Sequence, residues 1–159
     1  MKRGAIFDAT GCYRYWLWRT WDSEAAALTF IMLNPSTADD QVDDATIRRC
    51  IRFAQAWNYG SLSVVNLFAL VATYPQQLRS AADPVGHDCD RYLLEAVDRA
   101  AQVIVAWGNW GRLHQRDQAV LSLLAAHQPL YCLGTCQNGQ PRHPLYLPKS
   151  IEPTQYGSH

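Results

Sequence analysis

The amino-acid sequence predicts a single α/β domain with a mainly parallel sheet, helices on both faces and an antiparallel hairpin at one edge. Short continuous apolar runs are typical of strands that are covered on both faces. Segments with apolar residues three and four positions apart alternate with these runs and indicate amphipathic helices. No repeat, low-complexity tract or linker divides the 159 residues. Strands that alternate with helices favour a parallel sheet joined by right-handed crossovers.

The first segments of the chain are typical of the edge hairpin. Residues 3–8 and the aromatic-rich residues 13–21 are expected to form its two strands, with a turn near Thr10-Gly11. The continuous apolar run from Ala27 to Leu33 then predicts a strand that is buried on both faces. This run stops abruptly at Asn34-Pro35, which therefore marks the end of the strand.

Helices and strands alternate over the rest of the chain. Asp43 or Asp44 is expected to cap a helix that closes at Tyr59-Gly60. Further helices are predicted over residues 87–101 and 110–126, and further buried strands over residues 62–67, 103–107 and 130–133. We expect one domain over residues 1–150 and a loose C-terminal tail over residues 151–159.

Composition and charge count against several classes of protein. Basic and acidic residues both total 14, and a zero net charge counts against stable binding of long duplex DNA. The apolar runs are too short to cross a bilayer and the start of the chain has no h-region, so we expect a cytoplasmic protein. The five cysteines are scattered without a CxxC pair, which favours reduced thiols over a zinc site. Six tryptophans and eight tyrosines either fill a core or provide stacking surfaces for flat ligands.

Polar, turn-forming residues follow the predicted core strands. In open parallel sheets, ligands bind beyond the carboxyl ends of the strands, where the crossover loops meet. The residues at these ends are Asn34-Pro35-Ser36, Asn66, Gly108-Asn109, Gly134-Thr135 and Arg142-His143-Pro144. We expect them to lie on one rim of the sheet and to form the working site.

Asn66 is the least ordinary of these residues, because it lies within the apolar sequence Val64-Val65-Asn66-Leu67-Phe68. An unpaired carboxamide in such a place costs roughly 1–3 kcal/mol. Asn66 either bonds the neighbouring backbone or reads a ligand edge with paired donor and acceptor sites, such as a pyrimidine. Asn34 has an ordinary alternative too, because Asn before Pro commonly starts a turn.

Other residues allow further chemistry. Arg142 suggests an anion, and His143 beside it a donor or proton carrier. The acidic stretch Asp39–Asp44 could bind Mg²⁺ with a phosphate, but helix capping and solvation explain most of it. A serine hydrolase is disfavoured, because Ser36 lacks the flanking glycines of a nucleophile elbow. We expect no metal and no cofactor.

Five motifs occur in a recognisable order. They are Met32-Leu33-Asn34-Pro35-Ser36-Thr37-Ala38, Val65-Asn66-Leu67-Phe68-Ala69, Asp83-Pro84-Val85-Gly86, Ala106-Trp107-Gly108-Asn109 and His143-Pro144-Leu145-Tyr146. Together they resemble the bacterial domain-of-unknown-function family 1643 (DUF1643), and the resemblance runs from the hairpin to Pro148. The name of that family implies no activity.

A more distant similarity is to the uracil-DNA glycosylase superfamily, which implies a three-layer α/β/α fold around a short parallel sheet. Asn34-Pro35 resembles its first motif, whose polar residue positions the hydrolytic water. Asn66 matches the Asn that reads the pyrimidine edge, and His143-Pro144 resembles the final motif, whose His stabilises the developing anion on the base. The catalytic Asp of the first motif is absent, and Leu145-Tyr146 replaces small residues that help to enter a duplex. The resemblance therefore implies a base or nucleotide pocket more than active duplex repair.

The leading expectation is a nucleobase- or nucleotide-recognising protein, including an N-glycosidase that acts on a nucleotide, nucleoside or single-stranded nucleic acid. In this interpretation Asn34 and His143 are catalytic, Asn66 reads the base and Arg142 contacts phosphate. Phe68 or Trp107 stacks on the base, and the remaining binding residues are Pro35, Ser36, Gly108 and Asn109. The alternatives are a non-catalytic nucleotide or nucleic-acid binding module, and a protein-interaction domain that uses Tyr13, Trp16 and Trp18 of the hairpin.

Overall fold

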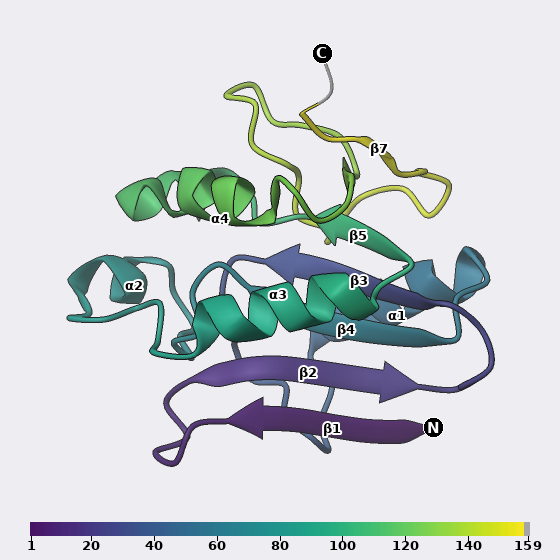
Figure 1. The fold of residues 1–159 in the computed structure, drawn as a ribbon, viewed down its shortest axis with the longest axis horizontal. Coiled ribbons are helices and arrows are strands. Elements are labelled where there is room, and N and C mark those ends of the chain that lie inside the picture. Colours follow the sequence, from purple (N-terminus) through teal and green to yellow (C-terminus); the bar gives the residue numbers. More distant parts are fainter. Residues whose placement is uncertain (158–159) are drawn as a thin grey trace.

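The computed structural model describes residues 1–157, and it confirms an α/β fold. These residues form one mixed sheet of seven strands in the order β1-β2-β4-β3-β5-β6-β7, which is larger than the sheet that the sequence predicts. The central strands β4, β3, β5 and β6 are parallel, whereas β1, β2 and β7 run antiparallel to their neighbours at the two edges. Figure 1 shows the hairpin at one edge and β7 at the other.

The edge hairpin is confirmed. It consists of β1 (Lys2–Phe7) and β2 (Arg14–Thr20), which pair antiparallel around the Thr10-Gly11 turn. The second strand also pairs antiparallel with β4 (Ser61–Asn66), with Leu17 opposite Val64. Because β2 runs opposite to β4, the start of β2 lies at the rim where β4 ends.

The parallel strands end almost level with one another. In the pairing of β3 (Ala27–Met32) with β4, Met32 lies opposite Asn66, the last residue of its strand. On the other side of β3 lies β5 (Gln102–Val105), which is followed outward by β6 (Leu130–Cys132). The carboxyl ends of the core strands therefore meet at one rim, as expected for a parallel sheet.

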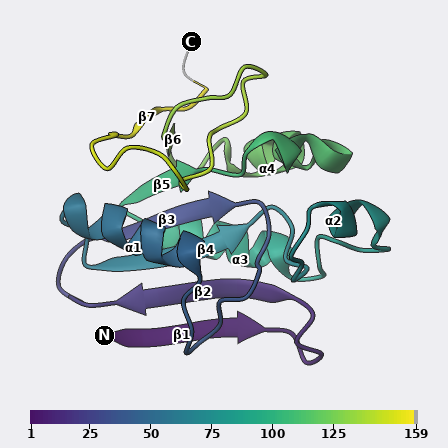
Figure 2. The same ribbon diagram turned by 180° about the vertical axis from the view of Figure 1, so that it is seen from behind.

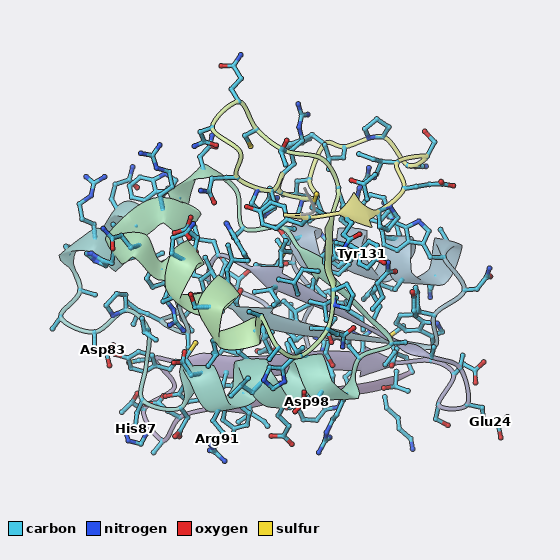
Figure 3. The ribbon with its side chains drawn as sticks, turned by 45° about the horizontal axis from the view of Figure 1, so that its top comes forward. Glu24, Asp83, His87, Arg91, Asp98 and Tyr131 are labelled. Carbon is cyan, nitrogen blue, oxygen red and sulfur yellow. The ribbon has the colours of Figure 1, made fainter. Side chains whose placement is uncertain are left out.

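Helices cover both faces of the sheet. On one face lies α1 (Ala45–Ala56), which is capped by Asp44, whose Oδ1 accepts a hydrogen bond from the Ile47 N–H at 2.9 Å. On the other face lie α3 (Cys89–Arg99) and α4 (Arg116–Leu124), and the two opposite views separate these helices from α1 (Figures 1 and 2). Arg91 and Asp98 project outward from α3, away from the sheet (Figure 3).

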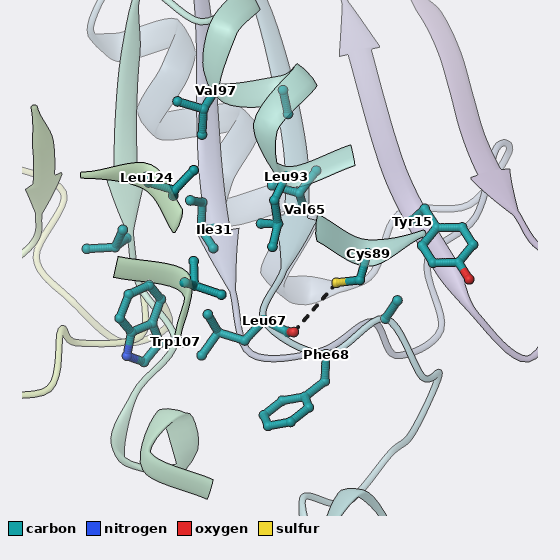
Figure 4. Close-up of a cluster of buried hydrophobic side chains, with 14 of the residues drawn as sticks. Tyr15, Ile31, Val65, Leu67, Phe68, Cys89, Leu93, Val97, Trp107 and Leu124 are labelled. Atoms are coloured by element: carbon teal, nitrogen blue, oxygen red, sulfur yellow. Dashed lines mark hydrogen bonds between the residues drawn. The ribbon is translucent and has the colours of Figure 1, made fainter. Parts of the chain in front are cut away.

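Each covered face has its own apolar cluster. The face under α3 and α4 includes Ile31, Val65, Leu67, Leu93 and Trp107 (Figure 4). The opposite face includes residues of α1 together with Phe30, Val64 and Ile104. Adjacent residues of β4 thus point to opposite faces, which is the ordinary alternation of a strand.

Three segments differ from the sequence prediction. Residues 110–126 do not form one helix, because the 3-10 helix η1 (Asn109–Gln115) ends in two residues with positive φ, His114 (55°) and Gln115 (56°), before α4 begins. A short helix, α2 (Gln76–Ser80), interrupts the loop after β4. The expected loose tail is not loose throughout, because β7 (Thr154–Gln155) pairs with β6; residues 158–159 of that tail lie outside the described residues. Within residues 1–157, no helix combines the length and the apolarity that a membrane span requires.

Candidate functional site

A pocket of about 320 Å³ opens at the rim where the parallel strands end. It lies at the lower end of the size range of small-molecule pockets, roughly 300–1,000 Å³. Its walls come from the start of β2, the ends of β3 and β4, the first turn of α1 and the loops around residues 72–75 and 143–145. Of the residues that the sequence singles out, the pocket brings together Asn34, Pro35, Ser36, Asn66, Trp107 and His143.

Asn66 is the most unusual polar residue of the pocket. Only 2% of its surface is exposed, and its Nδ2 and Oδ1 atoms have no hydrogen-bond partner among the described residues. The backbone bonds that would have explained this carboxamide in the core are thus not made. Nearly all buried polar groups in proteins are paired, so an unpaired carboxamide beside a pocket is typical of a group whose partner is a ligand or an ordered water.

Asn34 joins two loops that line the pocket. Its Nδ2 donates to the carbonyl oxygens of Pro35 at 2.9 Å and of Ala72 at 2.8 Å. The backbone bond from the Ala72 N–H to the Pro35 carbonyl, at 3.0 Å, strengthens the same connection. These bonds use both amide hydrogens for the turn, and the Oδ1 atom remains as the acceptor that Asn34 can offer to a ligand or water.

His143 enters the pocket from the last loop of the domain. Its Nδ1 accepts a hydrogen bond from the Leu145 N–H at 3.2 Å, which leaves Nε2 as the N–H donor of the neutral ring. Burial lowers the pKa of the imidazole below its ordinary value of 6.5, and the negative charge of Asp44 opposes this effect. A hydrolase triad needs an Nδ1–H that donates to a carboxylate, so the Leu145 contact does not fit a Ser36–His143 nucleophile pair.

Trp107 forms part of the pocket wall but is almost fully buried, with 1% of its surface exposed. Its Nε1 donates to Gln140 Oε1 at 2.8 Å, and Gln140 Nε2 donates to Asp117 Oδ2 at 3.0 Å. This buried chain of hydrogen bonds ties the loop before His143 to the end of β5. Trp107 therefore helps to hold the pocket wall in place.

The structure places the other expected site residues elsewhere. Phe68 has no exposed surface and lies within the apolar cluster, so it offers no face on which a base could stack (Figure 4). Gly108, Asn109 and Arg142 line a neighbouring, more open hollow that shares His143 and Leu145 with the pocket. Arg142 donates to the Thr135 carbonyl oxygen at 3.2 Å. At Gly108 the backbone has a φ of 73°, which favours glycine.

The acidic stretch before α1 has a local structural explanation. Asp39 Oδ1 accepts hydrogen bonds from the Gln41 and Val42 N–H groups, and Asp43 pairs with Arg19 and Arg3. Together with the capping by Asp44, these contacts account for three of its carboxylates. Over residues 1–157, no cluster of three His, Cys, Asp or Glu side chains has an arrangement that could hold a metal ion.

Arg14 and Asp44 are pocket residues that the sequence did not identify as binding residues. Arg14 is 2% exposed and lines the pocket from the start of β2. Asp44 lines it from the cap of α1. The predicted hairpin is the feature of the sequence that could have identified Arg14. Because its second strand runs antiparallel to β4, the first residue of that strand lies at the rim where β4 ends.

The model of one protein family, described as "Protein of unknown function (DUF1643)", matches residues 14–145. The matched range begins and ends with Arg14 and Leu145, the first and last residues that line the pocket. No curated protein and no solved structure matches the chain.

Proposed function

The chain belongs to the DUF1643 family, and since the description of that family names no activity, we propose from the pocket itself that the protein recognises a nucleobase-containing small molecule. The observation that carries this proposal is the unpaired carboxamide of Asn66 at the pocket. A carboxamide presents a donor beside an acceptor, and the Watson–Crick edge of a pyrimidine presents the complementary pair. Binding such an edge would satisfy both atoms at once.

The position of Asn66 in the sheet supports this role. Asn66 and Val64 line the pocket from the same face of β4, whereas Val65 between them packs into the opposite core. The carboxamide is therefore held by a central strand with neighbours on both sides. A binding group on a rigid strand discriminates against ligands that leave it unpaired, because the desolvation cost then stays uncompensated.

The finer part of the proposal is an N-glycosidase on the uracil-DNA glycosylase fold. The arrangement that supports it is the convergence of Asn34, Asn66 and His143 on one pocket. Asn34 Oδ1 would position the attacking water or the sugar, and the Nε2–H of His143 would donate to the base as negative charge develops on it. Fixed donors of this kind stabilise a departing anion without reorganisation.

The first experiment is a thermal-shift and calorimetric panel of free bases, nucleosides, nucleotides and short single strands. We expect a pyrimidine compound to stabilise the wild type and the Asn66→Leu variant to bind it roughly 10- to 100-fold more weakly, equivalent to about 1.4–2.8 kcal/mol. Thr29→Val is the matched control, because Thr29 is a buried polar residue of the neighbouring strand whose hydroxyl is already bonded to the Ala96 carbonyl. Absence of binding by every base-containing compound would overturn the proposal.

The second experiment separates catalysis from binding. Base release from the bound compound is followed by chromatography for the wild type and for the double variant Asn34→Ala, Asn66→Ala. The glycosidase assignment requires release by the wild type and its loss in the double variant. Tight binding without release would instead identify a non-catalytic nucleotide-binding module.

A further inference from the structure

Two buried arginines of β2 differ in how they are satisfied. Arg19 is fully buried and donates to the Asp43 carboxylate at 2.8 Å and to backbone carbonyls of Gly4, Trp18, Asp39 and Val42. Within the described residues, the guanidinium of Arg14 makes one hydrogen bond, from Nη1 to the Ala38 carbonyl at 3.0 Å. Its Nε atom is buried without a partner, and no carboxylate of residues 1–157 lies within ion-pair distance.

The charge of Arg14 is only partly balanced by its surroundings. Burial lowers the pKa of its guanidinium to about 10, so the group stays cationic at neutral pH. The carboxylates of Asp44 and Asp39 favour the charged form from a distance, and Arg19 disfavours it. Asp44 Oδ1 is engaged by the Ile47 N–H as the helix cap. A buried cation without a bonded counter-ion is costly, which is the situation that an anionic ligand relieves.

The lining of the pocket that contains Arg14 offers further donors to an anion. Ser36, Thr46 and Thr73 contribute to the pocket lining, and each carries a hydroxyl group. Thr46 lies in the first turn of α1, a helix of 12 residues whose N-terminal end favours negative charge. Arg142, the arginine that the sequence suggested for this role, lines the neighbouring hollow instead.

We propose that the ligand carries a phosphate monoester bound by Arg14, so that the pocket takes a free nucleoside monophosphate with its base at Asn66. The position of the base in this inference rests on the proposed function, whereas the phosphate site rests on Arg14 and on the donors of the pocket lining. A free nucleotide fits better than a strand, because Arg14 is buried and serves a single phosphate. Binding to a strand uses a row of accessible cations, and this chain has zero net charge.

The test compares the dissociation constants of a pyrimidine nucleoside and its 5′-monophosphate. We expect the wild type to prefer the monophosphate at least tenfold, and Arg14→Met to lower this preference to below threefold while nucleoside binding changes little. Arg112→Met is the control, because Arg112 is an exposed arginine outside the pocket and its loss should leave the preference intact. Equal binding of the two compounds by the wild type, or an equal loss of both in Arg14→Met, would overturn the inference. Loss of the preference in Arg142→Met instead would do the same.

Two further arms keep the outcomes distinct. Ribose 5-phosphate, which has no base, should bind weakly, and its binding should depend on Arg14. If it binds while nucleosides do not, the result supports the anion site and contradicts the assignment of the base to Asn66. A 5′-phosphorylated oligonucleotide that binds more tightly than the monophosphate would contradict the free nucleotide as ligand. If Arg14→Met does not fold, inorganic phosphate decides the question in the wild type: it should displace the monophosphate but not the nucleoside.

Discussion

Trp107 Nε1 donates a hydrogen bond to Gln140 Oε1 at 2.8 Å, and this contact joins the end of β5 to the loop that carries His143. Gln140 continues the connection to the Asp117 carboxylate at the start of α4. All three side chains are buried. The loop that contributes His143 and Leu145 to the pocket wall is thus held in place by a buried polar network.

Replacing Gln140 by Leu should loosen this wall. The change leaves the Trp107 N–H and the Asp117 carboxylate buried without their partner, and each unpaired group costs roughly 1–3 kcal/mol. We expect the free energy of unfolding to fall by at least about 1 kcal/mol in urea denaturation. The exposed Gln137 of the same loop provides the control, since Gln137→Leu removes no buried hydrogen bond. Equal stability of the two variants would contradict a structural role for the network.

Asn66→Leu should raise the stability of the ligand-free protein while it weakens ligand binding. The change replaces an unpaired buried carboxamide by an apolar side chain of similar size, and the relief is worth about 1–3 kcal/mol. Thr29→Val should do the opposite, because it removes a buried hydroxyl that has a partner. Chemical denaturation of both variants measures the difference. A destabilised Asn66→Leu variant would indicate that the carboxamide is satisfied by an ordered water.

Asp44 has two roles that can be separated by substitution. Asp44→Ala removes the cap of α1 and should lower the free energy of unfolding by about 0.5–2 kcal/mol. Asp44→Asn keeps a capping oxygen, so its stability should stay close to that of the wild type. Because it removes a negative charge from the pocket, Asp44→Asn should also bind anionic ligands more tightly than the wild type does. Weaker anion binding by this variant would show that the carboxylate itself is required.

His143 should make stability depend on pH in one direction. Burial lowers the pKa of the folded-state imidazole below its ordinary value of 6.5, so the unfolded chain takes up the proton first on acidification. The contribution of His143 is therefore complete above about pH 6.5 and is lost as the pH falls towards the lower folded-state pKa. Chemical denaturation at pH values from 8 to 5 should show a smaller loss of the free energy of unfolding for His143→Gln than for the wild type. The exposed His87 is the control, and a profile of His87→Gln that flattens as much as that of His143→Gln would refute this explanation.

Much of the fold could be predicted from local pattern. The hairpin, the buried strands, the cap at Asp44 and the helices α1 and α3 follow from apolar periodicity and from turn and capping residues, which act over a few neighbouring positions. The break between η1 and α4 could not be read in this way. The buried Arg116, which donates to the Leu67 carbonyl and pairs with Asp90, belongs to an otherwise ordinary helical pattern, and its partners lie far away in the sequence.

The site, like the fold, has features that local sequence predicts and features that depend on the tertiary structure. The sequence by itself placed Asn34 and Asn66 at the ends of core strands and His143 in a loop after the last of these strands, because strand ends and turns are local properties of the chain. Only the tertiary structure decided which side chains share the pocket: it buries Phe68, sends Arg142 to the neighbouring hollow and brings in Arg14 and Asp44. Strand order, register and side-chain pairing determine which of these side chains reach the pocket. Whether Asn66 and Arg14 find a partner depends on residues that the chain places beside them only when the whole sheet has formed.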